Sequence, residues 1–281
     1  MTIAFGGDGS VKSALRDRLE THAANGTLRF GATAWDGQGG TPLGVSTQGG
    51  DSADYAARFG YPLALAGLLD PMTAYADPDR AADVALAWVD MVAVGADLSM
   101  VPERIVEQLL DAMYADRLAV PFRAELRGLH RAERSATPPA RRDWTALRAR
   151  IEQAVEAAPV ASDARTALTA CATACWPLAT SSSVIPTLFS LWIRDVNRRP
   201  DPEFGEAVRD RAHIVLEEIY RETQPQRDAG EPVDIPARFR VRAPTLAAAF
   251  EAQLARSNAR HIARAQSVPD MVLTQLAAAS A

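Results

Sequence analysis

The sequence contains very few cysteines, and this scarcity excludes a disulfide framework as the basis of the fold. Cys171 and Cys175 are the only two in 281 residues, whereas small secreted domains that rely on disulfides carry several pairs. A structural zinc site needs four ligands, and no other cysteine or histidine lies near this pair in the sequence. We therefore interpret the two thiols, four residues apart in an alanine-rich segment, as buried packing groups of a reduced protein.

Long apolar runs and a basic leader are also missing. The longest apolar stretches, such as residues 62–69, fall far short of the ~20 residues that cross a membrane. The first residues show no basic region followed by an apolar run, which is the pattern of a secretory signal. Both absences predict a cytoplasmic protein that has no membrane partner.

Lysine is nearly absent, because Lys12 is the only one and arginine supplies every other basic side chain. This bias is typical of a bacterial genome of high GC content. The formal net charge is −5, and since binding to phosphate backbones requires clustered cations, we expect no nucleic acid partner. Hydrophobic residues make up 48% and charged residues 23% of the chain, a composition that excludes global disorder.

Apolar residues recur at intervals of three and four over most of the chain, and this period predicts helices. Clear examples lie in residues 11–19, 144–155 and 204–219, and the alanine-rich segments 245–256 and 259–279 continue the pattern. Strand signals are confined to residues 27–32 and 42–46, which flank turn residues 36–40, and to a weaker run at 235–241. The sequence thus predicts a mainly α, multi-helix globular fold with a small N-terminal β-hairpin.

A polar segment with a Pro-Pro break, residues 132–141, is the best candidate for a linker. It separates an N-terminal region of hairpin plus helices, residues 1–131, from a C-terminal helical region, residues 142–281. One continuous domain is the alternative, because a chain of 281 residues is compatible with one large domain or two ordinary ones.

Two motifs suggest ligand chemistry, and each has a structural explanation. Glycines 6, 7 and 9 precede a helix and resemble a phosphate-binding turn, but the lysine of a P-loop is not in frame, so we favour an N-terminal arm with Ser10 as helix cap. Asp210 and His213 have the spacing of a di-metal bundle, yet no second helix carries a matching pair. We expect no metal and no cofactor.

Four sequence pieces between residues 26 and 110 occur in a characteristic order: Ala34-Trp35, then 37–41, 59–70 and 94–98. In this order the segment resembles an uncharacterised family of bacterial proteins whose members read Gly-x-Tyr-Trp, a glycine-rich turn with cysteine, Leu-Gly-Ile-Pro-x-x-Leu-Ala-x-Leu-x-Asp and Val-Gly-Ala-Asp-Leu. Three positions depart from the family pattern, with Thr41 and Val45 in place of cysteines and Ser52 in place of a histidine. The resemblance implies no activity, and it implies no thiol or metal chemistry at these positions.

Glycine-rich turns bring several polar or amphipathic side chains together near the N-terminus, and any ligand site is expected there. The pairs at 39–40 and 49–50 allow the backbone to turn sharply. The candidate ligand-binding residues are Trp35, Asp36, Asp51, Asp54 and Tyr55. Asp51 also precedes an apolar helical stripe as an N-cap would, so a structural role competes with binding.

Two functional hypotheses remain open, and the sequence identifies no catalytic residue for either. The first is a non-catalytic helical protein that binds another protein and self-associates as a homo-oligomer, because its helices offer ample apolar surface. The alternative is an enzyme or a binding protein for a small, phosphate-containing ligand, with its site at the glycine-rich N-terminal region.

Overall fold

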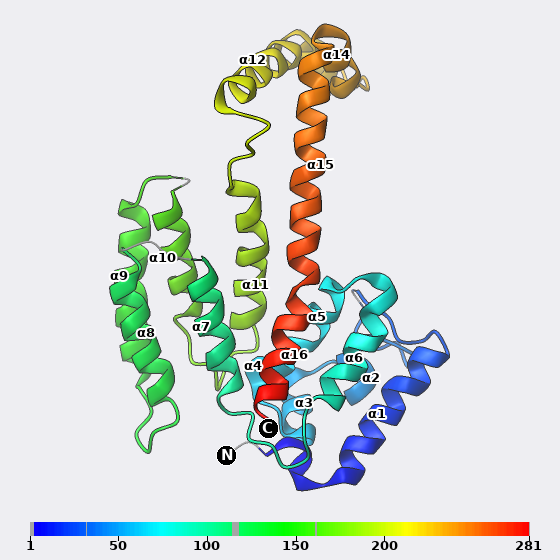
Figure 1. Ribbon diagram of the computed structural model, residues 1–281, viewed down its shortest axis with the longest axis vertical. Helices are drawn as coiled ribbons and strands as arrows, with labels where there is room; N and C mark the ends of the chain where they lie inside the picture. The colour runs from blue at the N-terminus through cyan, green and yellow to red at the C-terminus, as the bar shows by residue number, and fades with distance from the viewer. Residues whose placement is uncertain (1–2, 32, 114–117, 161, 281) are drawn as a thin grey trace. The chain divides into compact units, whose positions relative to one another are not determined.

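The computed structural model describes residues 3–31, 33–113, 118–160 and 162–280 (Figure 1). These residues are mainly helical and contain no strand, so the prediction of a mainly α fold is confirmed. No helix among them is both long and apolar enough to cross a bilayer. The chain forms two compact units, a first unit of residues 1–193 and 265–281 and a second unit of residues 194–264.

The first unit contains most of the helices. They are η1 (Ala4–Gly7), α1 (Gly9–Ala24), α2 (Pro42–Thr47), α3 (Ser52–Phe59), α4 (Leu63–Ala66), α5 (Leu69–Tyr75), η2 (Pro78–Arg80), α6 (Ala81–Asp90), α7 (Val101–Met113), α8 (Val120–Ala132), α9 (Arg141–Ala157), α10 (Asp163–Ala174), most of α11 (Val184–Asp195) and α16 (Val268–Ala278). Helices α8, α9 and α10 lie beside one another (Figure 1). The segment between α8 and α9, which includes the Pro-Pro break, lies inside this unit.

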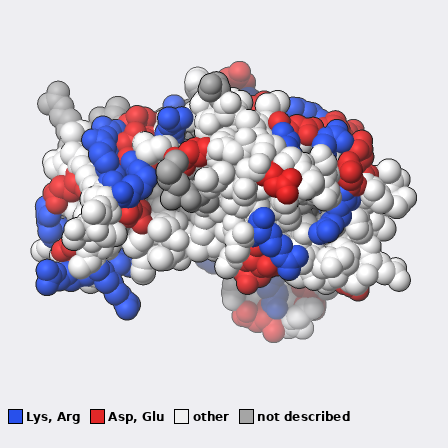
Figure 2. Space-filling model, turned by 90° about the horizontal axis from the view of Figure 1, so that it is seen from below, with Lys and Arg blue, Asp and Glu red and all other residues white. Residues whose placement is uncertain are grey.

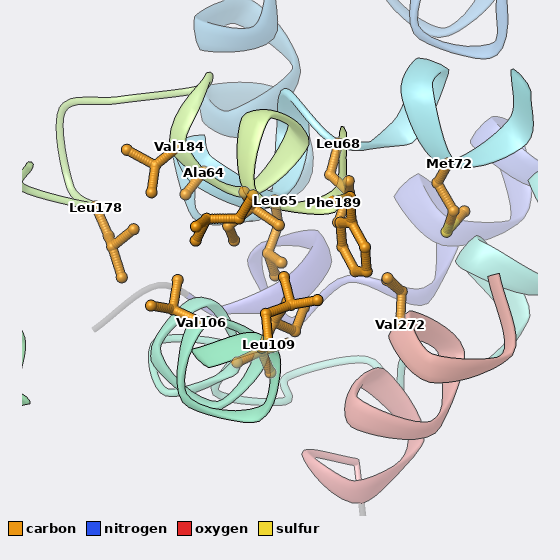
Figure 3. Close-up of a cluster of buried hydrophobic side chains, with 14 of the residues drawn as sticks. Ala64, Leu65, Leu68, Met72, Val106, Leu109, Leu178, Val184, Phe189 and Val272 are labelled. Carbon is orange, nitrogen blue, oxygen red and sulfur yellow. The ribbon is translucent and has the colours of Figure 1, made fainter. Parts of the chain in front are cut away.

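The core of the first unit joins helices that are far apart in the sequence. Leu65 of α4 and Leu109 of α7 pack with Phe189 of α11 and Val272 of α16, all of them buried (Figure 3). Burying a side chain of this size stabilises the fold by roughly 1.5–3 kcal/mol relative to exposure. The C-terminal helix is therefore an integral part of the first unit and is held there by apolar contacts.

The β-hairpin predicted near the N-terminus is absent, and that prediction was wrong. Among the described residues of this segment, 27–31 and 33–40, only isolated bridges form, between Leu28 and Gly40 and between Trp35 and Gly40. The second predicted strand, residues 42–46, lies in α2. An alternating run of only five residues is a weak strand signal, and the helix-start residues around it decide the structure.

Three features start α2 where a strand was expected. The hydroxyl of Thr41 accepts a hydrogen bond from the backbone N–H of Gly44 at 3.2 Å, which makes Thr41 an N-cap. Pro42 occupies the first turn, where its missing N–H costs nothing. The carboxylate of Asp70 in α5 accepts from the backbone N–H of Leu43 at 2.8 Å, so a tertiary contact also satisfies a free donor of this helix.

The same explanation holds for the third strand candidate, which belongs to the second unit. Residues 235–241 lie in α14 (Ile235–Arg242), where Asp234 caps the helix by accepting from the N–H of Ala237 at 2.8 Å. This unit also holds η3 (Val196–Arg198), α12 (Glu206–Glu222), α13 (Gln224–Asp228) and most of α15 (Pro244–Gln266). Its small core is built from Phe204, Ala212, Ile219, Phe239 and Ala247.

Candidate functional site

Trp35 and Asp36, two of the predicted site residues, form part of the turn that precedes α2. Trp35 is partly buried, and its ring meets that of His22 edge-to-face at 5.7 Å between centroids. The carboxylate of Asp36 accepts from the backbone N–H groups of Gln38 at 2.9 Å and Gly39 at 2.8 Å. These two donors, followed by Arg29, lower the pKa of Asp36 to about 2. Asp36 therefore holds this turn together.

The other three predicted site residues lie on or next to α3. Asp51 caps the helix by accepting from the N–H of Ala53 at 2.8 Å, and Asp54 pairs with Arg58 one turn later at 2.7 Å. Tyr55 is fully buried, and its hydroxyl accepts from the indole N–H of Trp88 at 3.0 Å. The chain thus places Tyr55 in the core and gives both carboxylates intramolecular partners.

Polar side chains in and next to the glycine-rich N-terminal segment, residues 6–12, also make structural contacts. Asp8, one position before α1, accepts from the N–H of Ser10 at 2.7 Å and caps the helix, so Ser10 is not the cap. The ammonium of Lys12 donates to the carbonyls of Asp90 at 3.1 Å and Val92 at 2.8 Å. Because it binds the C-terminal end of α6, this cation is already neutralised in part by carbonyl dipoles.

A cleft of about 520 Å³ lies elsewhere in the first unit, among the α3–α4 junction, the start of α7, the end of α8 and the loop after α10. We call it the α7–α8 cleft. Its apolar wall includes Tyr61, Pro62, Leu63 and Leu178. Four ionisable residues also line it, namely Glu103, His130, Glu133 and Arg134.

A ladder of ion pairs between α7 and α8 brings these charges together. Carboxylates recur at every fourth position of α7, at 103, 107 and 111. They pair in antiparallel order with Arg134 in the turn after α8 and with Arg127 and Arg123 of α8. The middle pair is 2.6 Å apart from Arg127 Nε to Glu107 Oε1. The pair of Glu103 and Arg134 opens into the cleft, where the Glu103 side chain is 5% and the Arg134 side chain 30% exposed.

His130, which also lines the cleft, is buried, and both of its ring nitrogens have a neighbouring oxygen. Nε2 lies 3.0 Å from the carbonyl oxygen of Ala174, which can only accept, so Nε2 carries a proton. Nδ1 lies 3.3 Å from Oε2 of Glu133. The ring also contacts Trp144 at 5.0 Å between centroids.

Glu133 fixes the loop that forms one side of the cleft. Its Oε2 accepts from the backbone N–H of Leu178 at 3.1 Å, and its Oε1 accepts from the N–H of Ala179 at 3.3 Å. Hydrogen bonds to a charged acceptor contribute roughly 1.5–3 kcal/mol each. One carboxylate at the end of α8 therefore fixes the loop that carries the apolar side chain of Leu178.

Arg134 is the group of this cleft that is best placed to meet a ligand. It is the most exposed of the four ionisable side chains, and a guanidinium has five N–H donors, more than one carboxylate uses. Within the described residues, no group of three or more histidine, cysteine, aspartate or glutamate side chains is arranged to hold a metal. The arrangement suits recognition of an acceptor group by Arg134.

One sequence pattern does indicate the helix pair that builds this site. Acidic residues 103, 107 and 111 and basic residues 123, 127 and 134 have helical spacing on consecutive segments of opposite charge. Such stripes usually mark solvated faces. Their meaning depends on the antiparallel packing of α7 and α8, and on a loop 45 residues beyond Glu133.

Comparison of the sequence with protein-family models and with curated proteins, and of the fold with solved structures, found no match. Function is therefore inferred from the geometry of this chain alone.

Proposed function

We propose that this chain binds a small polar ligand in the α7–α8 cleft. The observation that carries the proposal is that Glu103, His130, Glu133 and Arg134 line one cavity together with apolar residues. A volume of about 520 Å³ falls within the roughly 300–1,000 Å³ of small-molecule sites, which combine apolar walls with a few placed polar groups. This proposal keeps the hypothesis of a small-ligand protein and moves its site away from the glycine-rich region.

The chemistry of the cleft favours a ligand with an anionic end and an apolar body. A carboxylate or phosphate would accept from the donors of Arg134 that Glu103 does not use. The apolar body would lie along Tyr61, Leu63 and Leu178, which border the same cavity. Because Glu103 occupies one nitrogen of Arg134, the anion would approach the guanidinium from the side that Glu103 leaves free.

A thermal-shift panel of small carboxylic acids, sugar phosphates and nucleotides tests this proposal. A ligand at about a hundredfold above its Kd adds about 2.7 kcal/mol, which raises the Tm by several degrees. Arg134→Gln should abolish the rise. Arg131→Gln, which changes an exposed arginine in the last turn of α8, should retain it. A panel without any stabilising compound, or a rise that Arg134→Gln leaves intact, would contradict the proposal.

We also propose that the protein is cytoplasmic and that it binds another protein. Cys171 and Cys175 are free and buried, which agrees with a reducing compartment. Protein binding has its own support in an exposed aromatic groove that shares no lining residue with the α7–α8 cleft. Self-association stays a prediction, and light scattering of the purified chain tests it. Membership in the bacterial family that residues 26–110 resemble also stays a prediction.

A further inference from the structure

A second cavity, a groove of about 590 Å³, lies between α9 and the segment that follows α10. We call it the Trp176 groove. Its aromatic and proline lining comes from Trp144, Trp176, Pro139 and Pro177. Trp144 is buried and forms the floor, whereas Trp176 is 44% exposed and forms a wall. This groove shares no residue with the lining of the α7–α8 cleft.

The exposed indole is held in place by a cation. The guanidinium of Arg148 lies 3.5 Å from the ring centroid of Trp176, a distance at which cation–π attraction is effective. The indole is therefore presented as a fixed surface. Exposed, pre-positioned tryptophans beside arginines are the residue types that dominate binding energy at protein interfaces.

The arginines of α9 divide into those with a carboxylate partner and those that line the groove. Arg150 binds Glu125 through two hydrogen bonds of 2.7 and 2.8 Å, and Arg142 lies 3.8 Å from Asp143. Arg141 and Arg148 line the groove, and neither has an ion pair within the part of the chain that the structure describes. Basic side chains lie at the left of Figure 2, on the side of α8 and α9, with acidic side chains among them. The groove thus offers positive charge beside an apolar surface.

We propose that the Trp176 groove docks an acidic segment of another protein. A proline or apolar side chain of that segment packs against Trp176, and flanking carboxylates pair with Arg141 and Arg148. The complementarity of charge argues for an acidic partner, because Arg141 and Arg148 both line the groove and neither has an ion pair within the described residues. This function is separate from ligand binding in the α7–α8 cleft.

A peptide fits this surface better than a nucleic acid does. A single strand requires a groove whose positive charge follows the backbone from nucleotide to nucleotide. Here two cations are present, and Glu152 contributes a negative charge to the same lining. The net charge of −5 adds long-range repulsion of a polyanion.

Selection from a phage-displayed library of short random peptides, with the full chain as bait and a Trp176→Ser chain as the subtractive bait, tests the inference. The recovered peptides should be enriched in aspartate and glutamate around a proline or an apolar residue. Their affinity, measured by fluorescence polarisation of synthetic copies, should fall at least about tenfold in Trp176→Ser and in the double variant Arg141→Gln/Arg148→Gln. The matched control Arg142→Gln should bind as the parent chain does.

Circular dichroism and the Tm of each variant show whether it is folded, and only folded variants are compared. Recovery of no peptides above the subtractive bait, or of peptides without acidic enrichment, would overturn the proposal. A single-stranded oligonucleotide that competes for the groove with the same dependence on Trp176 would assign the groove to nucleic acid. A dimer that dissociates in Trp176→Ser would assign it to a second copy of this chain.

Discussion

Burial determines the chemistry of the two cysteines. Desolvation raises the pKa of Cys171 to about 12 and that of Cys175 to about 11. The thiol of Cys175 also lies 3.5 Å from the carbonyl oxygen of Trp144, to which it donates. Because the thiolate is the form that attacks disulfides and binds metals, both side chains act as small apolar groups near neutral pH.

We expect both thiols to be slow to react with a disulfide reagent in the native protein. With pKa values raised by two or more units, the thiolate population falls by about a hundredfold. Absorbance after addition of an aromatic disulfide, with and without urea, measures this protection. Equal rates of reaction with and without urea would contradict the burial of the thiols.

The raised pKa values of the two thiols also predict how the stability of the protein depends on alkaline pH. The stability that the protonated thiols contribute is fully present below pH 9, the ordinary pKa, and is lost as the pH rises toward 11.

Asp36 shows the opposite shift and gives a prediction at acid pH. Its pKa is lowered from 3.8 to about 2, first by the N–H groups of Gln38 and Gly39 and then by Arg29. The stability that its charge contributes is present above pH 3.8 and is lost as the pH falls toward 2. The difference in urea midpoint between the parent chain and Asp36→Ala should therefore shrink over this range. Asp36→Asn, which keeps an acceptor oxygen for the turn, should show a smaller difference at neutral pH.

Several elements are in contact through glycines where no side chain fits. A Cβ at Gly44 of α2 would lie 1.6 Å from the carbonyl oxygen of Ala34, and one at Gly67 would lie 2.3 Å from that of Ser182. The first approach packs the turn around Trp35 directly onto α2. The second packs the α4–α5 junction onto the segment before α11.

Gly44→Ala should destabilise the protein through this backbone contact. Overpacking of this kind costs typically about 1–3 kcal/mol, and a backbone atom has little room to move. Gly128→Ala is the matched control, because Gly128 is helical and its Cβ would meet nothing within 4 Å. That control should stabilise α8 by up to about 1 kcal/mol. Equilibrium unfolding in urea measures both changes, and a neutral Gly44→Ala would show that the turn does not pack on α2.

Long helices could be predicted from the sequence, whereas the type of a short segment could not. Long helices with repeated apolar spacing were predicted well, and Trp144, Leu147 and Ile151 of α9 are buried on one face as their period indicated. The prediction of a strand at residues 42–46 was wrong, because Thr41 and Pro42 favour the start of a helix more strongly than five alternating residues favour a strand. The period of a segment determines its type only when the segment is long enough to outweigh its caps.

The candidate site depends on contacts between segments, and for that reason it was not predicted. Its charges come from two neighbouring helices, but Glu133 acts through backbone N–H groups of a loop whose sequence gives no hint of that partner. The residues proposed from the sequence, Trp35 and Asp36 among them, were chosen because glycines surround them. Those glycines serve close backbone packing, as Gly40 does, where a Cβ would lie 1.8 Å from the oxygen of Ala34.

Within the first unit, one loop connects the α7–α8 cleft and the Trp176 groove. Leu178 and Ala179 line the cleft, whereas Trp176, Pro177 and Thr180 line the groove. Glu133 holds the loop from the side of the cleft. His130, which contacts Glu133, also packs on the floor of the groove. A substitution of Glu133 is therefore expected to alter both the α7–α8 cleft and the Trp176 groove.

Glu133→Ala should weaken peptide binding in the Trp176 groove, although Glu133 does not line it. The variant removes the acceptor of the Leu178 and Ala179 N–H groups, at a cost of about 1–3 kcal/mol, and it releases the backbone that carries Trp176. Fluorescence polarisation with the selected peptides measures the affinity, and hydrogen exchange measures protection of the two N–H groups. Arg134→Gln is the control, because it alters the cleft without touching the loop, and it should leave peptide affinity unchanged. Full protection and full affinity in Glu133→Ala would show that the two surfaces are independent.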